Sequence, residues 1–193
     1  MNEAVQISPT ASAPFRFTVD QFLALCDQGI FDGYAKSELI DGEIVVMNAQ
    51  HSRHARVKSR LAIRLGNALE KLGSPFEPQV EASVRMGDGS LPEPDIVLTS
   101  YRGEGVVPVE TVALLVEVSD STLATDLGRK ADLYADAGVR EYWVVDLNED
   151  RVLCHANPRE DGSGYDGQLD VLFGTPLYAA TVDGLTVETV SLD

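Results

Sequence analysis

Apolar and polar positions recur with helical periods in three parts of this chain of 193 residues. Residues 52–73 place an apolar side chain at every third or fourth position and end in glycine, which predicts a long amphipathic helix. A helix is also predicted over 18–29, where Thr18 and Gln21 have the spacing of a capping box. The same period over 125–138 predicts a third and shorter helix.

Extended segments lie between these helices. Asp41-Gly42 is a strong hairpin signal within "SELIDGEIVVM". The runs 113–119 and 141–147 are apolar enough to be central strands, and other extended stretches are predicted over 76–86 and 94–100, joined by the turn "GDGS", and as short strands after residue 151. Helices that alternate with strands predict an α/β or α+β core, a sheet with helices packed on it.

The chain shows no internal repeat and no linker, so we expect one domain over residues 15–193. Residues 1–14, rich in Ser, Pro and Ala, are predicted to be a flexible arm and lack the apolar region of a secretory signal. No window approaches the roughly 18 apolar residues of a membrane span. Cys26 and Cys154 lie far apart without CxxC spacing, which favours a reducing, cytoplasmic setting over a disulfide framework.

One carboxylate stands where a core strand should be apolar. In "ALLVEVS", residues 113–119, alternation puts Leu115, Glu117 and Ser119 on one face and aliphatic side chains on the other. An unpaired buried carboxylate costs several kcal/mol, roughly, unless it is compensated. Glu117 therefore either lies at a mouth open to water or holds a cation.

Three further ionisable residues stand at apolar positions. Asp95 opens an apolar strand after a proline, Glu38 begins the first hairpin, and Lys130 lies on the apolar side of the third helix, while Arg129 faces solvent. Carboxylates that hold a hard divalent cation beside a lysine that orients water form a known arrangement for phosphodiester hydrolysis. The alternative is structural, with Lys130 as the ion-pair partner of Glu117.

The motifs "SELIDGEIV", "PEPDIVL", "LLVEVSDST" and "DLGRKADLYADAGVREYWVVD" resemble, in order and spacing, the Uma-type family of restriction endonucleases. The similarity runs from about residue 17 to 150 and extends to the PD-(D/E)XK nuclease signature. It implies an α/β restriction-endonuclease-like core, with a mixed central sheet flanked by helices. It also implies a metal site at Glu38, Asp95 and Glu117 and a catalytic lysine at Lys130.

The chain departs from the wider signature at position 119, where that signature has its lysine and this chain has Ser119. The Uma-type pattern resembles a version in which the lysine has moved to the following helix. Lys130 occupies that place, in agreement with the helical periodicity.

Charge bears on the substrate. With 31 acidic and 15 basic residues the net charge is −16, which opposes binding to nucleic acid. The long helix is an exception, because residues 44–69 contain no Asp or Glu. Four arginines form one stripe on this helix, and we call them the basic ridge. The ridge is either a DNA-binding surface or an ordinary solvated face, and its members are Arg53, Arg56, Arg60 and Arg64.

His51 and His54 are three residues apart, and the second is expected to face the core near the site rather than to bind a metal with the first. No P-loop, GxGxxG or GxSxG motif is present, so no nucleotide cofactor is expected. The sequence thus predicts a cytoplasmic DNA endonuclease that depends on Mg²⁺, with Mn²⁺ as a substitute, and that acts as a homodimer without a membrane. The rival interpretation is a catalytically silent nuclease-like module that binds another protein; RNA as substrate stays open.

Overall fold

A computed structural model describes residues 13–193, so all but the last two residues of the predicted arm lie outside the described residues. Its centre is a six-stranded mixed sheet in the order β10-β9-β8-β7-β5-β3, in which only β7 and β8 run parallel to each other. The strands of this sheet are β3 (Glu77–Val80), β5 (Ile96–Thr99), β7 (Val112–Ser119), β8 (Glu141–Asp146), β9 (Arg151–Pro158) and β10 (Tyr165–Leu172).

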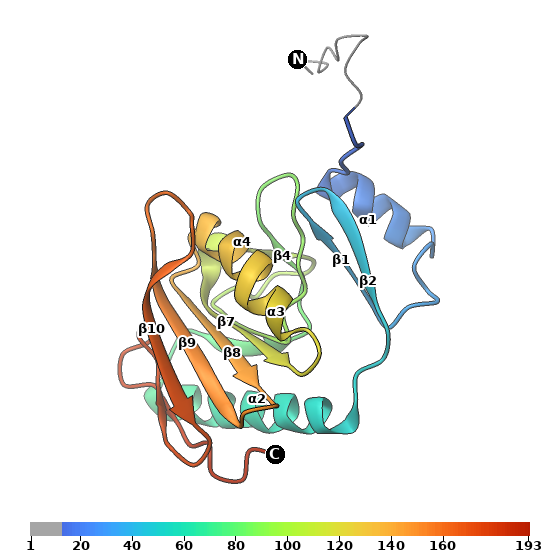
Figure 1. Cartoon of the computed structure of the whole chain (residues 1–193). Helices are drawn as coiled ribbons and strands as arrows, with labels where there is room; N and C mark the ends of the chain where they lie inside the picture. The colour runs from blue at the N-terminus through green and yellow to red at the C-terminus, as the bar shows by residue number, and fades with distance from the viewer. Residues whose placement is uncertain (1–12) are drawn as a thin grey trace.

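Helices cover both faces of the sheet, as Figure 1 shows. Helix α2 (Ser52–Leu72) lies across one face, and α3 (Leu123–Thr125), the π-helical turn η2 (Asp126–Lys130) and α4 (Ala131–Asp136) lie on the other. The architecture confirms the predicted α/β class with a mixed central sheet. No described helix has the length and apolar character that crossing a membrane requires.

Strand β7 shows why its sequence alternates between aliphatic residues and others. Leu114 and Val116 pack on the α2 side with Leu61 and Leu65, whereas Leu115 packs on the α4 side. Every residue of β7 is buried, because the strand lies between β5 and β8 and under helices on both faces. Glu117 shares the face of Leu115, as the alternation predicts.

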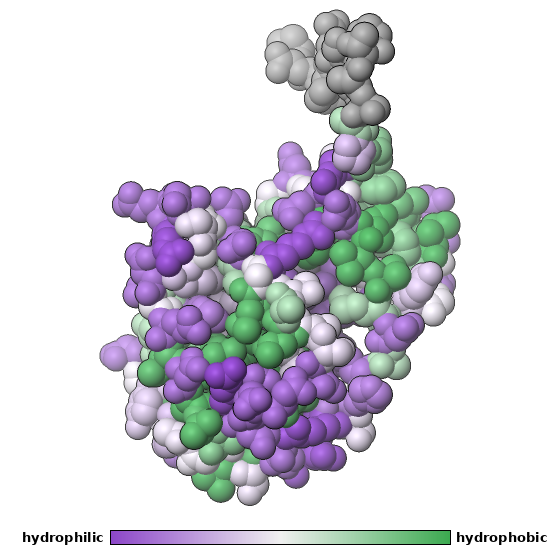
Figure 2. Space-filling view, in the orientation of Figure 1, coloured by the Kyte–Doolittle hydropathy of each residue, from purple (hydrophilic) through white to green (hydrophobic). Residues whose placement is uncertain are grey.

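A smaller unit stands beside the sheet (Figure 1) and consists of α1 (Val19–Asp27) and the hairpin of β1 (Lys36–Ile40) and β2 (Glu43–Met47). The capping box of Thr18 and Gln21 is present, and the turn residues Asp41 and Gly42 both have positive φ, 50° and 75°. Figure 2 shows apolar residues gathered near α1, and those with large exposed fractions there include Phe15, Ile30 and Tyr34.

Two stretches differ from the expected pattern. The extended segment predicted over 76–86 breaks after β3, because Glu81 adopts a left-handed conformation with φ 54°. The third helix is not regular, since η2 widens its first full turn into a π-helix. The remaining short elements are β4 (Val84–Arg85), β6 (Val107–Pro108), η1 (Val109–Thr111), β11 (Leu177–Tyr178) and β12 (Thr186–Val187).

Candidate active site

A cavity of about 660 Å³ lies between the hairpin, the carboxyl end of β7, the start of α2 and η2. The candidate residues Glu38, Asp95, Glu117 and Lys130 all line it. They come from β1, the position before β5, β7 and η2, so residues far apart in sequence meet at one end of the central strand. The described structure thus brings together all four residues expected at the site.

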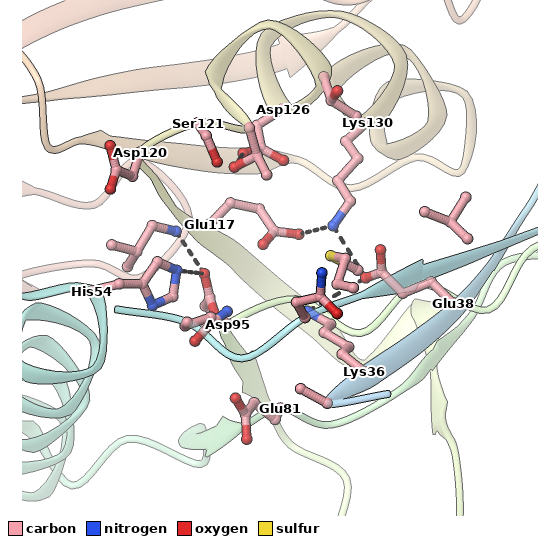
Figure 3. Close-up of a pocket in the computed structure, with 18 of the residues that line it drawn as sticks. Lys36, Glu38, His54, Glu81, Asp95, Glu117, Asp120, Ser121, Asp126 and Lys130 are labelled. Atoms are coloured by element: carbon pink, nitrogen blue, oxygen red, sulfur yellow. Dashed lines mark hydrogen bonds and ion pairs between the residues drawn. The ribbon is translucent and has the colours of Figure 1, made fainter. Parts of the chain in front are cut away.

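Lys130 lies between two of these carboxylates (Figure 3). Its Nζ is 2.8 Å from Glu117 Oε1 and 3.1 Å from Glu38 Oε1, and all three side chains are buried. Arg129, the next residue back, is much more exposed and pairs with Asp41 on the hairpin. The helical periodicity therefore assigned the inward and outward positions of these two cations correctly.

Glu117 also accepts a hydrogen bond from the hydroxyl of Tyr134 at 2.8 Å, again through Oε1. Burial raises the pKa of Glu117 to about 7, although the positive charges of Lys130 and Lys36 act in the opposite direction. The same carboxylates hold the pKa of Lys130 well above its usual range, even though burial alone would lower it. Lys130 is consequently protonated at neutral pH, while Glu117 is poised to lose or take up a proton.

Asp95 is held by four donors. Its Oδ2 accepts the backbone N–H of Val118 at 2.8 Å and lies 3.1 Å from His54 Nε2. Its Oδ1 accepts from Lys58 Nζ and from Gln50 Nε2, both at 3.3 Å. Despite burial, the hydrogen bond and charge of His54 keep the pKa of Asp95 well below its usual range, so this carboxylate is ionised.

Periodicity placed His54 correctly, but Lys36, Gln50, Lys58 and Tyr134 were missed as site residues. Lys36 had a usable signal, because it is two residues from Glu38 on one strand and therefore shares its face. Lys58 is four residues after His54, which puts both on one side of α2. No sequence pattern pointed to Gln50. Tyr134 lies on the apolar side of the third predicted helix, where it was interpreted as a core residue.

The donor set suits a hard cation. Asp95 and Glu117 supply carboxylate oxygens, and Glu117 Oε2 has no hydrogen-bond partner among the described residues. Mg²⁺ prefers such ligands, commonly one or two carboxylates with water completing its shell. Within residues 13–193 no group of three acidic, His or Cys side chains is arranged to hold a metal ion. Glu38 is engaged instead by Lys130 and by the backbone N–H of Glu93, 2.7 Å from its Oε1.

Position 119 has a structural role. The Ser119 side chain is fully buried, and its hydroxyl donates to Asp126 Oδ2 at 2.7 Å. Asp126 is itself 3% exposed and accepts a second hydrogen bond from Thr122. Asp126 also lines the cavity, so a lysine at position 119 would replace the Ser119 hydroxyl in this buried contact, whereas Lys130 reaches Glu117 and Glu38 from η2.

The basic ridge lies mostly under the chain's last residues. Arg60 and Arg64 donate to backbone carbonyls of Glu188 and Ser191, and Arg60 also contacts the Asp193 carbonyl. Arg53 pairs with Asp150 at 2.5 Å. Arg56 is the exception, being exposed with no hydrogen-bond or ion-pair partner in the described part of the chain.

Comparison with known proteins agrees with the fold. A six-stranded mixed sheet with carboxylates and a lysine at the end of its central strand is the architecture of an α/β nuclease-like protein. The chain belongs to the Uma2 family, described as "Putative restriction endonuclease", whose model matches residues 19–183. No curated protein matches the chain.

One solved structure similar to this chain is a crystal structure described as "a putative nuclease belonging to DUF820", from Anabaena variabilis. The TM-score is 0.65 over 93% of this chain and 97% of the other, at 16% sequence identity. At that identity the similarity concerns the fold. It extends over nearly the whole of both chains.

Proposed function

We propose that the protein is a Mg²⁺-dependent DNA endonuclease that hydrolyses phosphodiester bonds in the cavity beside β7. The observation that carries the proposal is the pair formed by Glu117 and Lys130, a buried carboxylate with one free oxygen and a buried ammonium 2.8 Å from the other. Membership of the Uma2 family supports the same reaction class. Asp95 and Glu117 would hold the cation, and a bound Mg²⁺ would supply Lewis-acid stabilisation of the phosphate oxygens.

The charges that line the cavity favour a cation. Its lining includes six carboxylates and three permanent cations. Without a bound metal ion, this excess of negative charge would repel an anionic phosphodiester. The carboxylates are Glu38, Glu81, Asp95, Glu117, Asp120 and Asp126, and the cations are Lys36, Arg129 and Lys130.

Lys130 would orient the attacking water and stabilise the negative charge that develops on the phosphate. Its raised pKa keeps it protonated, so it acts as a donor and not as the base. Two of its three N–H groups are directed at Glu117 and Glu38, which leaves one for water or phosphate. Glu38 would hold Lys130 in place, and its predicted role as an accessory ligand stays a prediction.

Calorimetry with Mn²⁺ or Mg²⁺ tests the metal site. Binding is expected in the unaltered protein and a loss of at least tenfold in affinity in Asp95→Asn and in Glu117→Gln, with Glu70→Gln, an exposed carboxylate on α2, as the control. Plasmid nicking should fall at least about 100-fold in Glu117→Gln and in Lys130→Ala but not in Lys71→Ala. Metal binding that does not depend on Asp95 and Glu117 would contradict the proposal.

One observation favours the rival, a silent module that binds another protein. Asp95 is already paired with Lys58, and Lys130 with Glu38 and Glu117. These contacts within the chain balance the charges of the site without a bound metal ion. Absence of both metal binding and cleavage would select that rival. Pairing of two copies stays a prediction, which sedimentation of the protein with and without DNA tests.

A further inference from the structure

The candidate catalytic side chains are almost wholly buried in the wall of the cavity. Asp95 is 2% exposed, Glu117 4% and Lys130 6%. The β1–β2 hairpin forms one wall of the cavity around them, since Glu38 on β1 and Val45 on β2 are paired in register and both line the cavity. Figure 3 shows Lys36 and Glu38 reaching into the pocket from the β1 side, opposite Glu117. The hairpin therefore forms one wall of the space through which a phosphate would reach the carboxylates.

The volume of the cavity limits what can enter. A sphere of 660 Å³ is about 11 Å across, too small to enclose a double helix with both of its grooves, which are about 12 Å and about 6 Å wide. Pockets of about 300 to 1,000 Å³ hold small ligands. The space suits one or two nucleotides separated from their pairing partners, whereas an intact double helix keeps its phosphates on the outside of a wide, stiff cylinder.

The basic ridge offers few free basic side chains for contacts with the phosphates of a duplex. Binding to duplex DNA uses several Lys and Arg contacts to phosphates. Three of the four ridge arginines are engaged within the chain, which leaves Arg56, and the net charge is −16. A single strand carries about half the phosphate charge of a duplex per unit length, so the acidic surface repels it less.

We infer that the site acts on single strands or on nucleotides already unpaired, as in a bubble, a mismatch or a frayed end, and not on intact duplex. This inference rests on the proposed nuclease function and names its substrate class. The part of the cavity wall that comes from the hairpin includes Ile40, Val45 and Met47. Those aliphatic side chains can contact a base without reading its edge, so cleavage should show little sequence preference.

Cleavage rates test the inference with three forms of one oligonucleotide: single-stranded, fully paired, and paired around a central bubble of mismatches. With Mg²⁺ or Mn²⁺, the single strand and the bubble should be cut at least about 50-fold faster than the full duplex, and within the bubble rather than outside it. Equal rates on all three substrates would overturn the inference.

Hydrolysis of the small diester bis(p-nitrophenyl) phosphate separates this failure from failure of the function itself. If the small diester is hydrolysed in a manner that requires Glu117 while duplex and single strand are cut equally, the substrate inference is wrong and the nuclease function stands. If neither the diester nor any oligonucleotide is hydrolysed, the proposed function fails, and the inference fails with it.

A pair of neighbouring variants tests the role of the hairpin. Val45→Trp should narrow the cavity on the hairpin side and slow single-strand cleavage at least tenfold more than it slows hydrolysis of the small diester. Val46→Trp is the control, because Val46 is 37% exposed and does not line the cavity. Melting curves confirm that each variant folds, and Met47→Trp replaces Val45→Trp if that variant does not. Equal effects at positions 45 and 46 would contradict the inference.

Discussion

Lys130 Nζ lies 2.8 Å from Glu117 Oε1, and both side chains are almost wholly buried. A buried ion pair of this kind recovers the cost of desolvation only when other groups satisfy the remaining donors and acceptors. Tyr134 does so for Glu117, and Glu38 does so for Lys130. The site is therefore a connected network, and changes at its members should have effects that do not add.

Glu117→Gln should weaken the pH dependence of the stability of the metal-free protein. Because burial raises the pKa of Glu117 from 4.5 to about 7, the folded state binds a proton more tightly than the unfolded state does. The associated stability is fully present below about pH 4.5 and is lost as the pH rises through 7. The free energy of unfolding of the variant should therefore decline less between pH 5 and 8 than that of the unaltered protein. Lys130 keeps Glu38 as its partner.

Urea denaturation at pH 5 and at pH 8 measures this effect, with Glu70→Gln as the matched control. The control should change the free energy of unfolding by less than about 0.5 kcal/mol at either pH. An equally steep decline between pH 5 and 8 in Glu117→Gln and in the unaltered protein would contradict the raised pKa of Glu117.

Metal affinity should rise with pH below about 7. Glu117 is partly protonated there, and a cation must displace that proton to bind the carboxylate. The dissociation constant for Mn²⁺ should fall by up to about tenfold between pH 6 and 7 and then level off. Calorimetry in buffers of different ionisation enthalpy measures the released proton directly, and an affinity independent of pH would exclude Glu117 as a ligand.

Lys130→Met should destabilise the protein by about 2 to 4 kcal/mol, because it leaves two buried carboxylates near each other without their shared cation. Arg129→Met is the control, and should cost less than about 1 kcal/mol since its ion pairs are partly exposed. Adding Glu117→Gln to Lys130→Met should restore part of the loss. Strict additivity of the two changes in a double-mutant cycle would show that the pair is not coupled.

Ser119→Ala should cost about 1 to 2 kcal/mol, because Asp126 would lose one of two buried hydrogen bonds. Ser121→Ala, at an exposed position, should be neutral within about 0.5 kcal/mol and serves as its control. Ser119→Lys should not restore nicking to Lys130→Ala, since the new ammonium would meet Asp126. Restored activity would show that a lysine at position 119 can replace Lys130 and would contradict this prediction.

Arg64→Ala should loosen the last residues of the chain, because Arg64 donates to the carbonyls of Glu188 and Ser191. Faster amide exchange over 186–193 is expected, with a cost of about 0.5 to 1.5 kcal/mol. Arg56→Ala should leave that exchange unchanged. If the ridge binds nucleic acid, Arg56→Ala should weaken that binding. The slope of log affinity against log salt concentration should then fall by about the amount that one phosphate contact contributes.

The sequence by itself determined which face of each element is buried. Alternation placed Glu117 with Leu115, the helical period turned Lys130 inward and Arg129 outward, and Asp41-Gly42 set the hairpin that carries Glu38. These are local properties, since they follow from the geometry of one strand, one helix or one turn.

Only the tertiary structure decided which side chains of different elements contact one another. Lys58 and Gln50 reach Asp95 because α2 and the segment before it dock beside β5, and the last residues cover Arg60 and Arg64 because Leu192 is buried in the core on the α2 side. Periodicity assigns a side chain to a face but does not say which other element will pack there. The meeting of the hairpin with the central sheet is such a property, because it brings Glu38 of β1 to Lys130 and so beside Glu117 of β7.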